Sequence, residues 1–445
     1  MQENARTIKT AFWFAIYNSV VLPLIYLGFR IVALFSGKVR QGISGRKRLR
    51  AVIAQFNQTR DMSRSLYVVH CASLGEYEMA KPLIEAIRKR SRETYIVLTF
   101  FSPSGFEQVR ETAPVDLVTY LPFDSVNQVS HFYRTLAPNA LILTSYEIWP
   151  NLIWLADRYQ VEAFLTSARL QNGNAKTYPL VRSLYSTVYG SIGHIYPITQ
   201  EDYNNLTRYY SLPESTEMQV TGNTRYDRVL ERSREARDRR LLPARYRHAP
   251  TFIAGSIWPA DNKVVLPALK NLLSEYADLQ VVLAPHEPSE HHLRDLSDWC
   301  ENFQVDYELY SNIQQKKEAE NHGRVLLVDT IGVLAELYHA GDIAFVGGGF
   351  SGSVHNVMEP AVAGCAVLYG PDHQSSNEAE QLVKSGGGFA VTDSEQLWGT
   401  LYNLLTDSEA LRMAQAQAYG VIERNAGATE ATVDRILANQ QGDGR

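Results

Sequence analysis

The chain has 445 residues, too many for one ordinary domain and suited to two of about 200 residues each. Hydrophobic residues make up 45% and charged residues 20%, which are globular values and exclude a largely disordered chain. The first 60 residues contain ten Lys or Arg and one acid, whereas the rest contains 33 basic and 47 acidic residues. Such asymmetry predicts a separate partner for the basic segment. The three cysteines form no metal or disulfide pattern, which indicates a reducing compartment.

An uncharged run of nineteen residues extends from Ala11 to Phe29. As a helix it would span about 28 Å, close to the thickness of a bilayer core, with a kink expected at Pro23. Seven basic residues follow it by position 50, so the positive-inside rule predicts that the rest of the chain is cytoplasmic. We expect a membrane anchor, which either spans the bilayer or lies along it. A cleaved signal peptide and an ordinary core helix are the alternatives.

From Leu66 onward, short apolar runs alternate with segments of helical periodicity. This pattern predicts an α/β protein with parallel sheets covered on both faces. The charge-dense stretch 227–248 predicts a helix and a linker between two Rossmann-like halves, whose working cleft would lie between them at the carboxyl ends of strands. The predicted strands are LYVVHCAS, YIVLTF, LVTYLP, ALILTS, VEAFLTS and HIYPIT before the linker, and TFIAGS, LQVVLAP, VLLVD, IAFVGGG and AVLYG after it.

Three motifs in the first half carry candidate functional side chains at strand ends. In HCASLGEYE (70–78), Glu76 falls in the first turn of a helix, where it could accept a proton as a general base. The helix dipole favours a glutamate there in any case, so a purely structural role is equally open. In TSYEIWPNLI (144–153), Glu147 could bind a sugar hydroxyl or hold a neighbouring loop. Arg169, in SARL, is a candidate anion contact.

The second half contains glycine-containing turns suited to a phosphate. Ser256, in AGSIWPADN, ends a strand just before a helix, where backbone N–H groups are available. His286, in APHEP, ends the next strand and is a candidate cleft residue. In VGGGFSGSVHNVMEPAVAG (346–364), glycines precede a helix expected to start near Asn356, and Glu359 could accept hydrogen bonds from a ribose.

Eight motifs in this order resemble those of the 3-deoxy-D-manno-octulosonic acid (Kdo) transferases: SLGE, YEIWPN, SARL, GNTRYD, AGS, DTIG, FVGGG and HNVMEP. The resemblance extends from the apolar run to about Gly388. It implies a GT-B glycosyltransferase, with two Rossmann-like domains facing each other across a cleft, anchored to the cytoplasmic face of the inner membrane. Such enzymes transfer Kdo from CMP-Kdo to the lipid A precursor, lipid IVA, with inversion. The implied partners are these two substrates and membrane lipids, without nucleic acid, metal or cofactor.

The resemblance also assigns roles to individual residues. Glu76 matches the family's general base, and backbone N–H groups at Ser256 and Gly349 would hold the departing CMP. Where many members have P-R-H, this chain has APH (284–286), and where they have M-G-E it has IGV (331–333), so side-chain contacts at Pro285 and Val333 are in question. The implied substrate-binding residues are Glu147, Arg169, Ser256, Pro285, His286, Ile331, Gly332, Val333, Gly349, Asn356, Val357, Met358 and Glu359.

We expect three parts: an anchor and basic flank (1–40), an acceptor domain (41–235) and a CMP-Kdo domain (236–445). Another GT-B enzyme, such as a UDP-sugar transferase or epimerase, is the first alternative. A membrane-anchored CMP-sugar-binding protein without catalysis is the second alternative. It is suggested by Pro285 and Val333, which stand where many family members have Arg and Glu. The third is an NAD-dependent enzyme, because Gly347, Gly349 and Gly352 formally match G-x-G-x-x-G, with Asp372 twenty residues beyond the last.

Overall fold

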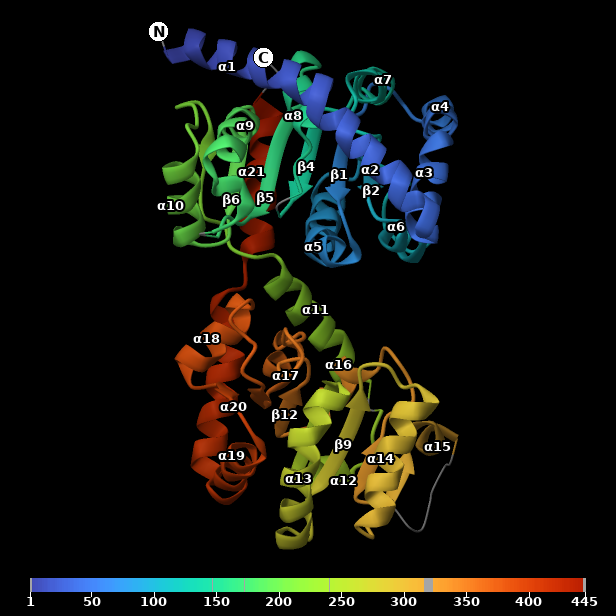
Figure 1. Ribbon diagram of the computed structural model, residues 1–445, viewed down its shortest axis with the longest axis vertical. Helices are drawn as coiled ribbons and strands as arrows, with labels where there is room; N and C mark the ends of the chain where they lie inside the picture. The colour runs from blue at the N-terminus through green and yellow to red at the C-terminus, as the bar shows by residue number, and fades with distance from the viewer. Residues whose placement is uncertain (1, 146, 172, 240, 316–322, 443–445) are drawn as a thin grey trace. The chain divides into compact units, whose positions relative to one another are not determined.

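A computed structural model describes residues 2–442 apart from 146, 172, 240 and 316–322. The chain forms two compact units, one of residues 1–228 and 426–445 and the other of residues 229–425. Each unit is built around a seven-stranded parallel sheet with helices packed against it (Figure 1). The predicted α/β class with two Rossmann-like parts is therefore confirmed.

The first sheet consists of the six predicted strands and one short edge strand. Its order is β3-β2-β1-β4-β5-β6-β7, and neighbouring strands are parallel. All six residues of β1 are buried, as expected for a strand covered on both faces. The two residues of β7 are too few to form a recognisable pattern. The strands are β1 (Leu66–Cys71), β2 (Tyr95–Phe100), β3 (Leu117–Tyr120), β4 (Ala140–Thr144), β5 (Glu162–Ala168), β6 (His194–Pro197) and β7 (Glu217–Met218).

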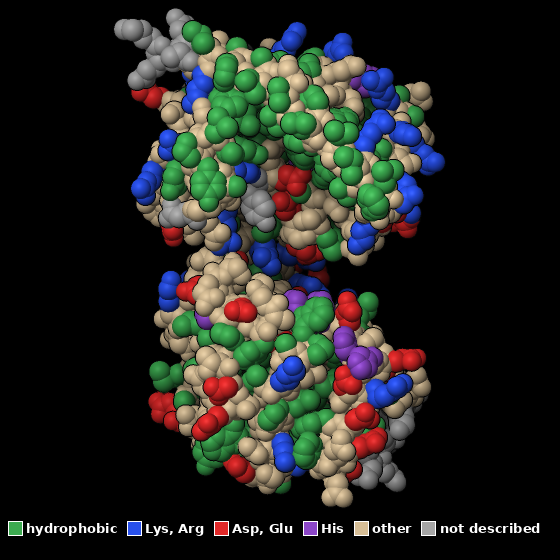
Figure 2. Space-filling view, viewed as in Figure 1, with side chains coloured by type: hydrophobic (Ala, Val, Ile, Leu, Met, Phe, Trp, Pro, Cys, Tyr) green, Lys and Arg blue, Asp and Glu red, His purple; other side chains and the backbone are tan. Residues whose placement is uncertain are grey.

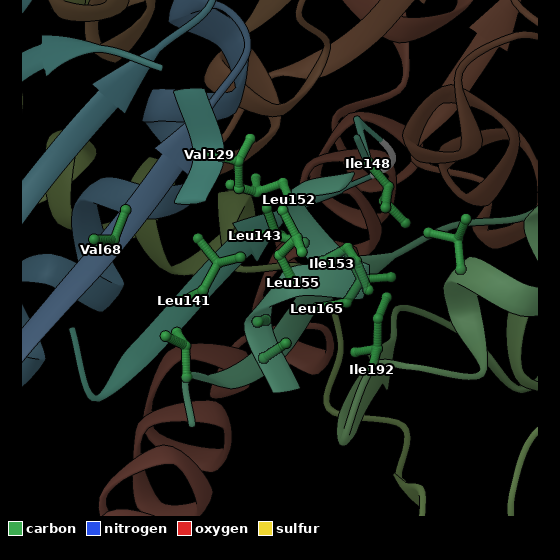
Figure 3. Packing of buried hydrophobic residues seen from close by; sticks show 14 of the residues in the cluster. Val68, Val129, Leu141, Leu143, Ile148, Leu152, Ile153, Leu155, Leu165 and Ile192 are labelled. Atoms are coloured by element: carbon green, nitrogen blue, oxygen red, sulfur yellow. The ribbon is translucent and has the colours of Figure 1, made fainter. Parts of the chain in front are cut away.

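Helices between these strands complete the core of the first unit. Figure 3 shows strand residues Val68, Leu141 and Leu143 packed with Leu152 and Ile153 of α8. Burying each of these side chains contributes about 1.5–3 kcal/mol to the free energy of folding. This packing holds the strands whose carboxyl ends carry the functional loops. The helices are α5 (Leu74–Arg90), α6 (Pro103–Val109), α7 (Val126–Leu136), α8 (Pro150–Arg158), α9 (Pro179–Tyr189) and α10 (Gln200–Tyr209), with a 3₁₀ turn, η2 (Ala175–Thr177), before α9.

The apolar run near the N-terminus forms a long helix that packs along the first unit. It consists of α1 (Gln2–Ile16), a π-helical turn η1 (Tyr17–Val21) and α2 (Leu22–Phe35). The wider turn ends two residues before Pro23, which has no backbone N–H to donate. Its stretch Arg6–Phe35 is, among the described residues, the one helix long and apolar enough to cross a membrane. Trp13, Tyr17 and Leu22 are buried. Helices α3 (Gly37–Lys47) and α4 (Leu49–Thr59) follow.

The second unit repeats the parallel arrangement, with the order β10-β11-β9-β8-β12-β13-β14. Its strands are β8 (Thr251–Ile257), β9 (Gln280–Pro285), β10 (Tyr307–Leu309), β11 (Val325–Leu327), β12 (Ile343–Val346), β13 (Ala366–Tyr369) and β14 (Gly388–Ala390). Its helices are α12 (Arg245–His248), α13 (Pro259–Glu275), α14 (Glu290–Asn302), α15 (Tyr310–Gln315), α16 (Leu334–Leu337), η3 (Tyr338–Ala340), α17 (Met358–Ala363), α18 (Asn377–Ser385), α19 (Ser394–Thr406) and α20 (Ser408–Arg424). Helix α11 (Arg225–Arg237) crosses the boundary between the units.

The last helix, α21 (Ala428–Gly442), belongs to the first unit although it ends the chain. Val433 and Ile436 are fully buried in one cluster with apolar residues of α5. Asp434 forms an ion pair with Arg90 at 2.5 Å. The sequence-based division between residues 235 and 236 placed this helix in the C-terminal domain. The structure differs because an apolar helix face shows that a helix is covered but not which sheet covers it.

Candidate functional site

Each sheet contains a point at which the chain leaves neighbouring strands in opposite directions. In the first sheet β1 lies between β2 and β4, and in the second β8 lies between β9 and β12. Loops that leave the carboxyl ends of such strands diverge, and open α/β sheets bind ligands in the crevice between them. Glu76 follows β1 and Glu147 follows β4, while Ser256 lies near the end of β8. Glu76 and Glu147 therefore lie at this point of the first sheet, and Ser256 lies at the corresponding point of the second sheet.

Glu76 lies in the first turn of α5 and is buried, with 7% of its surface exposed. The Ser73 hydroxyl caps this helix by accepting a hydrogen bond from the Glu76 N–H at 3.5 Å. The Glu76 Oε2 in turn accepts a hydrogen bond from the Ala72 N–H. Burial raises the pKa of Glu76 to about 7, and the charge of Glu147 acts in the same direction. A carboxylate with a pKa near neutrality is suited to act as a general base.

Glu147 lies just beyond β4 and is half-buried. Its Oε1 accepts a hydrogen bond from the Trp149 indole N–H at 2.9 Å, and this indole stacks on Phe101 with ring centroids 4.9 Å apart. Burial raises the pKa of Glu147 above its ordinary value. The preceding Ser145 has φ of 70°, a left-handed conformation in which the chain turns sharply at the strand end. Tyr146 of the same motif lies outside the described residues.

Lys176 is a member of this site that the sequence interpretation missed. It lies in η2, and its Nζ stands 4.7 Å from the centre of the Tyr185 ring. Burial lowers the pKa of Lys176 to about 8, against the charges of Glu147 and Glu76. A cavity of about 590 Å³ is lined by Glu147, Lys176 and apolar side chains of the N-terminal helix. The local sequence around Lys176, GNAKT, indicates an exposed loop and contains no signal that the lysine would be half-buried near two carboxylates.

Arg169 lies beyond the end of β5 and is half-buried. No described residue forms an ion pair with its guanidinium.

The GNTRYD segment has a structural role, because the Thr224 hydroxyl donates to the Met79 carbonyl at 2.7 Å. Asp227 accepts hydrogen bonds from the N–H groups of Gly427 and Thr429. This motif thus joins α5, α11 and α21.

Glycines at the edge of the second sheet allow unusually close backbone packing. A Cβ on Gly347 would lie 2.2 Å from the Ser256 carbonyl oxygen, and one on Gly349 would lie 2.6 Å from the Gly370 nitrogen. Gly348 has φ of 95°, and its N–H donates to Asp261 at 2.9 Å. Ser256 also has a positive φ, of 54°. The turn is therefore held by close backbone packing and by the Asp261 carboxylate, and its glycines let a ligand approach the backbone.

Three aromatic rings stack at the same edge. The rings of Trp258 and His286 are 4.4 Å apart, and those of His286 and His355 are 4.4 Å apart at an interplanar angle of 7°. The Trp258 indole donates a hydrogen bond to the His355 Nε2 at 2.7 Å. Burial lowers the pKa of His355, and the neighbouring His286 lowers it further. These rings follow β8, β9 and β12, three adjacent strands, so they form a continuous aromatic surface.

The remaining predicted residues occupy three places in the second unit: residues 356–359, the loop 331–333 and the end of β9. Val357 and Met358 are buried, and the Asn356 Oδ1 accepts a hydrogen bond from the Met358 N–H at 3.2 Å. Glu359, in the first turn of α17, forms an ion pair with Arg232 of α11 at 3.0 Å. The loop 331–333 leads into α16, with Ile331 75% exposed and Gly332 at φ of 85°. Pro285 is the last residue of β9.

Within the described residues, no group of three His, Cys, Asp or Glu side chains could hold a metal.

Comparison with known proteins gives concordant results. Residues 46–228 match the family of 3-deoxy-D-manno-octulosonic-acid transferases (kdotransferases). The 3-deoxy-D-manno-octulosonic acid transferase of Haemophilus influenzae is 26% identical over 434 residues, covering 95% of this chain and 98% of that protein. The enzyme of the same name from Aquifex aeolicus is 26% identical, covering 78% of this chain and 88% of that protein.

A likeness in fold extends to other enzymes. The structure of UDP-GlcNAc 2-epimerase from Neisseria meningitidis, bound to UDP-GlcNAc, matches with a TM-score of 0.60 at 16% identity. The match covers 84% of this chain and all of that one. At this identity the likeness concerns the GT-B-like fold alone.

Proposed function

The chain belongs to the family of Kdo transferases, and we propose on that premise that it transfers Kdo from CMP-Kdo to a lipid A precursor. The observation that carries this proposal within the structure is the group formed by Glu76, Glu147 and Lys176. These side chains are partly or wholly buried, influence one another's pKa values, and lie at the edge of the first sheet where a ligand is expected.

In the proposed reaction Glu76 is the general base. Its carboxylate accepts the proton of an acceptor hydroxyl while the hydroxyl oxygen attacks the anomeric carbon of Kdo. The bond from that carbon to the phosphate oxygen breaks, and CMP leaves with the electron pair. The products are the Kdo glycoside, with inverted configuration, and CMP, and the proton remains on Glu76. The Lys176 ammonium limits the rise in the pKa of Glu76, so that a useful fraction is ionised near pH 7.

We assign the nucleotide to the edge of the second sheet. Backbone N–H groups at Ser256 and Gly349 would hold the phosphate, and the ring surface of Trp258, His286 and His355 would contact the nucleotide. Glu359 is the proposed contact with ribose, and its ion pair with Arg232 fixes the position of this carboxylate.

The decisive experiment is mass spectrometry of the product formed by the purified full-length protein from CMP-Kdo and lipid IVA. A mass increase by one or more Kdo units is expected, and absence of any Kdo–lipid product would refute the function. Thermal shifts with CMP, UDP and UMP provide a second measurement. Stabilisation by UDP but not CMP would favour a UDP-sugar enzyme, whereas CMP binding without turnover would favour a binding protein.

We further propose that the N-terminal helix lies along the cytoplasmic face of the inner membrane rather than across the bilayer. Side-chain hydrogen bonds join its residues 13–26 to the rest of the first unit: Trp13 donates to Ser183, Tyr17 to Asp124 and Asn18 to Asn151, and Tyr26 accepts from Gln128. A span needs about 20 apolar residues free of such contacts, but only 27–35 remain beyond them in α2. Large hydrophobic side chains on the other face are exposed and suited to the lipid interface: Ile8, Phe12, Val20, Leu24, Leu27, Ile31, Val32, Leu34 and Phe35.

Cysteine labelling in intact spheroplasts tests this arrangement. All three native cysteines are buried, which leaves Ile8→Cys as the reactive position and Met62→Cys as a matched control on the first unit. If the helix lies on the cytoplasmic surface, a membrane-impermeant maleimide labels neither variant until the membrane is permeabilised. Labelling of Ile8→Cys alone in intact spheroplasts would show that the helix spans the bilayer.

A further inference from the structure

A cavity of about 550 Å³ lies in the first unit, between the end of α2, helices α3 and α4, and the segment before α7. Five of its lining residues are basic or titratable to a cation: Arg30, Arg46, Lys47, Arg50 and His131. No Asp or Glu lines it. The positive charges therefore reinforce one another inside a partly enclosed space, where the field that they produce is less screened than on an open surface.

Arg46 is the central residue of this cavity. Only 8% of its surface is exposed, and its guanidinium donates hydrogen bonds to the carbonyls of Leu121, Gly42 and Phe101. Its Cζ lies 4.5 Å from the centre of the Phe101 ring and 4.8 Å from that of Phe123. In the described part of the chain no carboxylate lies within ion-pair distance of it. The charge of Glu147 favours the cation but forms no ion pair with it. A buried cation without a direct counterion is costly, and three carbonyls leave two of its five N–H groups for a ligand.

The cavity adjoins the apolar surface of the N-terminal helix. Tyr26 and Phe29 of α2 line the cavity, while Leu27 and Ile31 of the same helix are exposed. Figure 2 shows hydrophobic side chains over this helix and Lys and Arg side chains gathered beside them over α3 and α4. A ligand with an anionic group attached to apolar chains would satisfy both surfaces at once.

A row of contacts joins the cavity to the candidate catalytic group. The Arg46 guanidinium lies over the Phe101 ring, Phe101 stacks on Trp149 at 4.9 Å, and the Trp149 indole donates to Glu147 at 2.9 Å. Phe101 thus contacts both Arg46, which lines the cavity, and Trp149, which holds Glu147. Two aromatic rings therefore connect a molecule bound to Arg46 with that carboxylate.

We propose that this cavity binds a phosphate monoester of the lipid acceptor, with Arg46, Lys47 and Arg50 as its ligands. This inference rests on the proposed function, because the acceptor is defined by it. The phosphate supplies the counterion that Arg46 lacks, and its position relative to Phe101 and Trp149 orients the acceptor sugar toward Glu147. Arg46, Lys47 and Arg50 are binding residues that determine the affinity for phosphorylated acceptors and take no part in proton transfer.

The test compares two double variants with equal loss of charge. Lys47→Gln with Arg50→Gln removes two cavity residues, whereas Lys38→Gln with Arg40→Gln removes two exposed residues of α3 that do not line it. Initial rates are measured in neutral detergent with lipid IVA and with its enzymatically dephosphorylated form. For the cavity variant we expect KM for lipid IVA to rise about 10- to 100-fold, with kcat within about threefold of wild type. The control should remain within about threefold in both constants.

The dephosphorylated acceptor separates phosphate recognition from a general effect of charge. With it, the difference in KM between wild type and the cavity variant should shrink to about threefold or less. An equal rise in KM with both acceptors, an equal rise in the Lys38/Arg40 control, or no rise at all would overturn the proposal. Inorganic phosphate at millimolar concentration is also added to reactions with each acceptor. If it inhibits the reaction with the dephosphorylated acceptor as strongly as the reaction with lipid IVA, the cavity binds free phosphate instead. Absence of product from the wild type would refute the proposed function, independently of the cavity.

Discussion

Both units are built around a seven-stranded parallel sheet whose first strand lies at the switch point, but the two sheets differ in strand order and present different chemistry at the carboxyl ends of these strands. The first places ionisable side chains there, and burial moves the pKa of Glu76 up to about 7 and that of Lys176 down to about 8. The second presents glycines and aromatic rings, and its acid, Asp261, accepts hydrogen bonds from the backbone N–H groups of Trp258 and Gly348. The first edge therefore groups two carboxylates with a lysine, as the proposed base requires, whereas the second offers mainly backbone N–H groups and aromatic rings, two of which are imidazoles.

The strongest test of this difference is Glu76→Gln, which removes the base and preserves the shape of the side chain. We expect turnover to fall by about 10²–10⁴-fold while CMP still raises the melting temperature. Glu85→Gln, on the same helix, serves as the control and should retain nearly full turnover. Near-normal turnover of Glu76→Gln would remove Glu76 from the mechanism and would leave the first edge without its base.

A second test uses the pH dependence of the wild type and of Lys176→Met. Because the base works only when deprotonated, kcat/KM of the wild type should rise with pH and level off above about pH 7. Loss of the Lys176 cation removes a charge that favours the carboxylate, so the inflection should move upward by about one pH unit. Activity at pH 7 should then fall about fivefold and recover at higher pH. Lys89→Met should leave the profile unchanged, and an unmoved inflection in Lys176→Met would contradict its proposed influence on Glu76.

The smallest expected effect comes from the second edge. His355→Leu removes one ring of the stack, and an aromatic contact contributes about 0.5–1.5 kcal/mol, so the Kd for CMP should rise about threefold. The pH at which kcat/KM levels off should not change, because no base is affected. Isothermal titration calorimetry with CMP measures the Kd, and His291→Leu, at an exposed position of α14, provides the control. A shifted pH profile in His355→Leu would show that the two edges do not divide their roles as proposed.

Much of the fold follows from local patterns. The runs beginning at Leu66 and Thr251 are continuous and apolar, and such runs form buried strands almost regardless of distant context. Edge strands such as β7, β10 and β14 have two or three residues and show no pattern of this kind. Placement of Glu76 and Glu147 at strand ends also follows from the sequence, because each directly succeeds a predicted strand. Their assigned roles remain predictions.

Other members of the site depend on contacts between distant parts of the chain. Lys176 is half-buried near carboxylates from two other loops, and nothing in its own segment indicates this. Arg46 was one of seven basic residues after the apolar run, all predicted alike, yet it alone among them is buried, against Phe101 and Phe123. Asp124 is buried by Tyr17, more than a hundred positions earlier.

By itself, the sequence determined the α/β class, the strand ends that carry Glu76 and Glu147, the glycine-rich turn of the second half and the apolar, basic N-terminus. These are local properties, because strand burial and close backbone packing are encoded in adjacent residues. Only the tertiary structure decided which charges are buried, which helix covers which sheet, and that the N-terminal helix packs along the first unit. The physical reason is that burial and the electrostatic shifts it causes depend on neighbours contributed by remote segments.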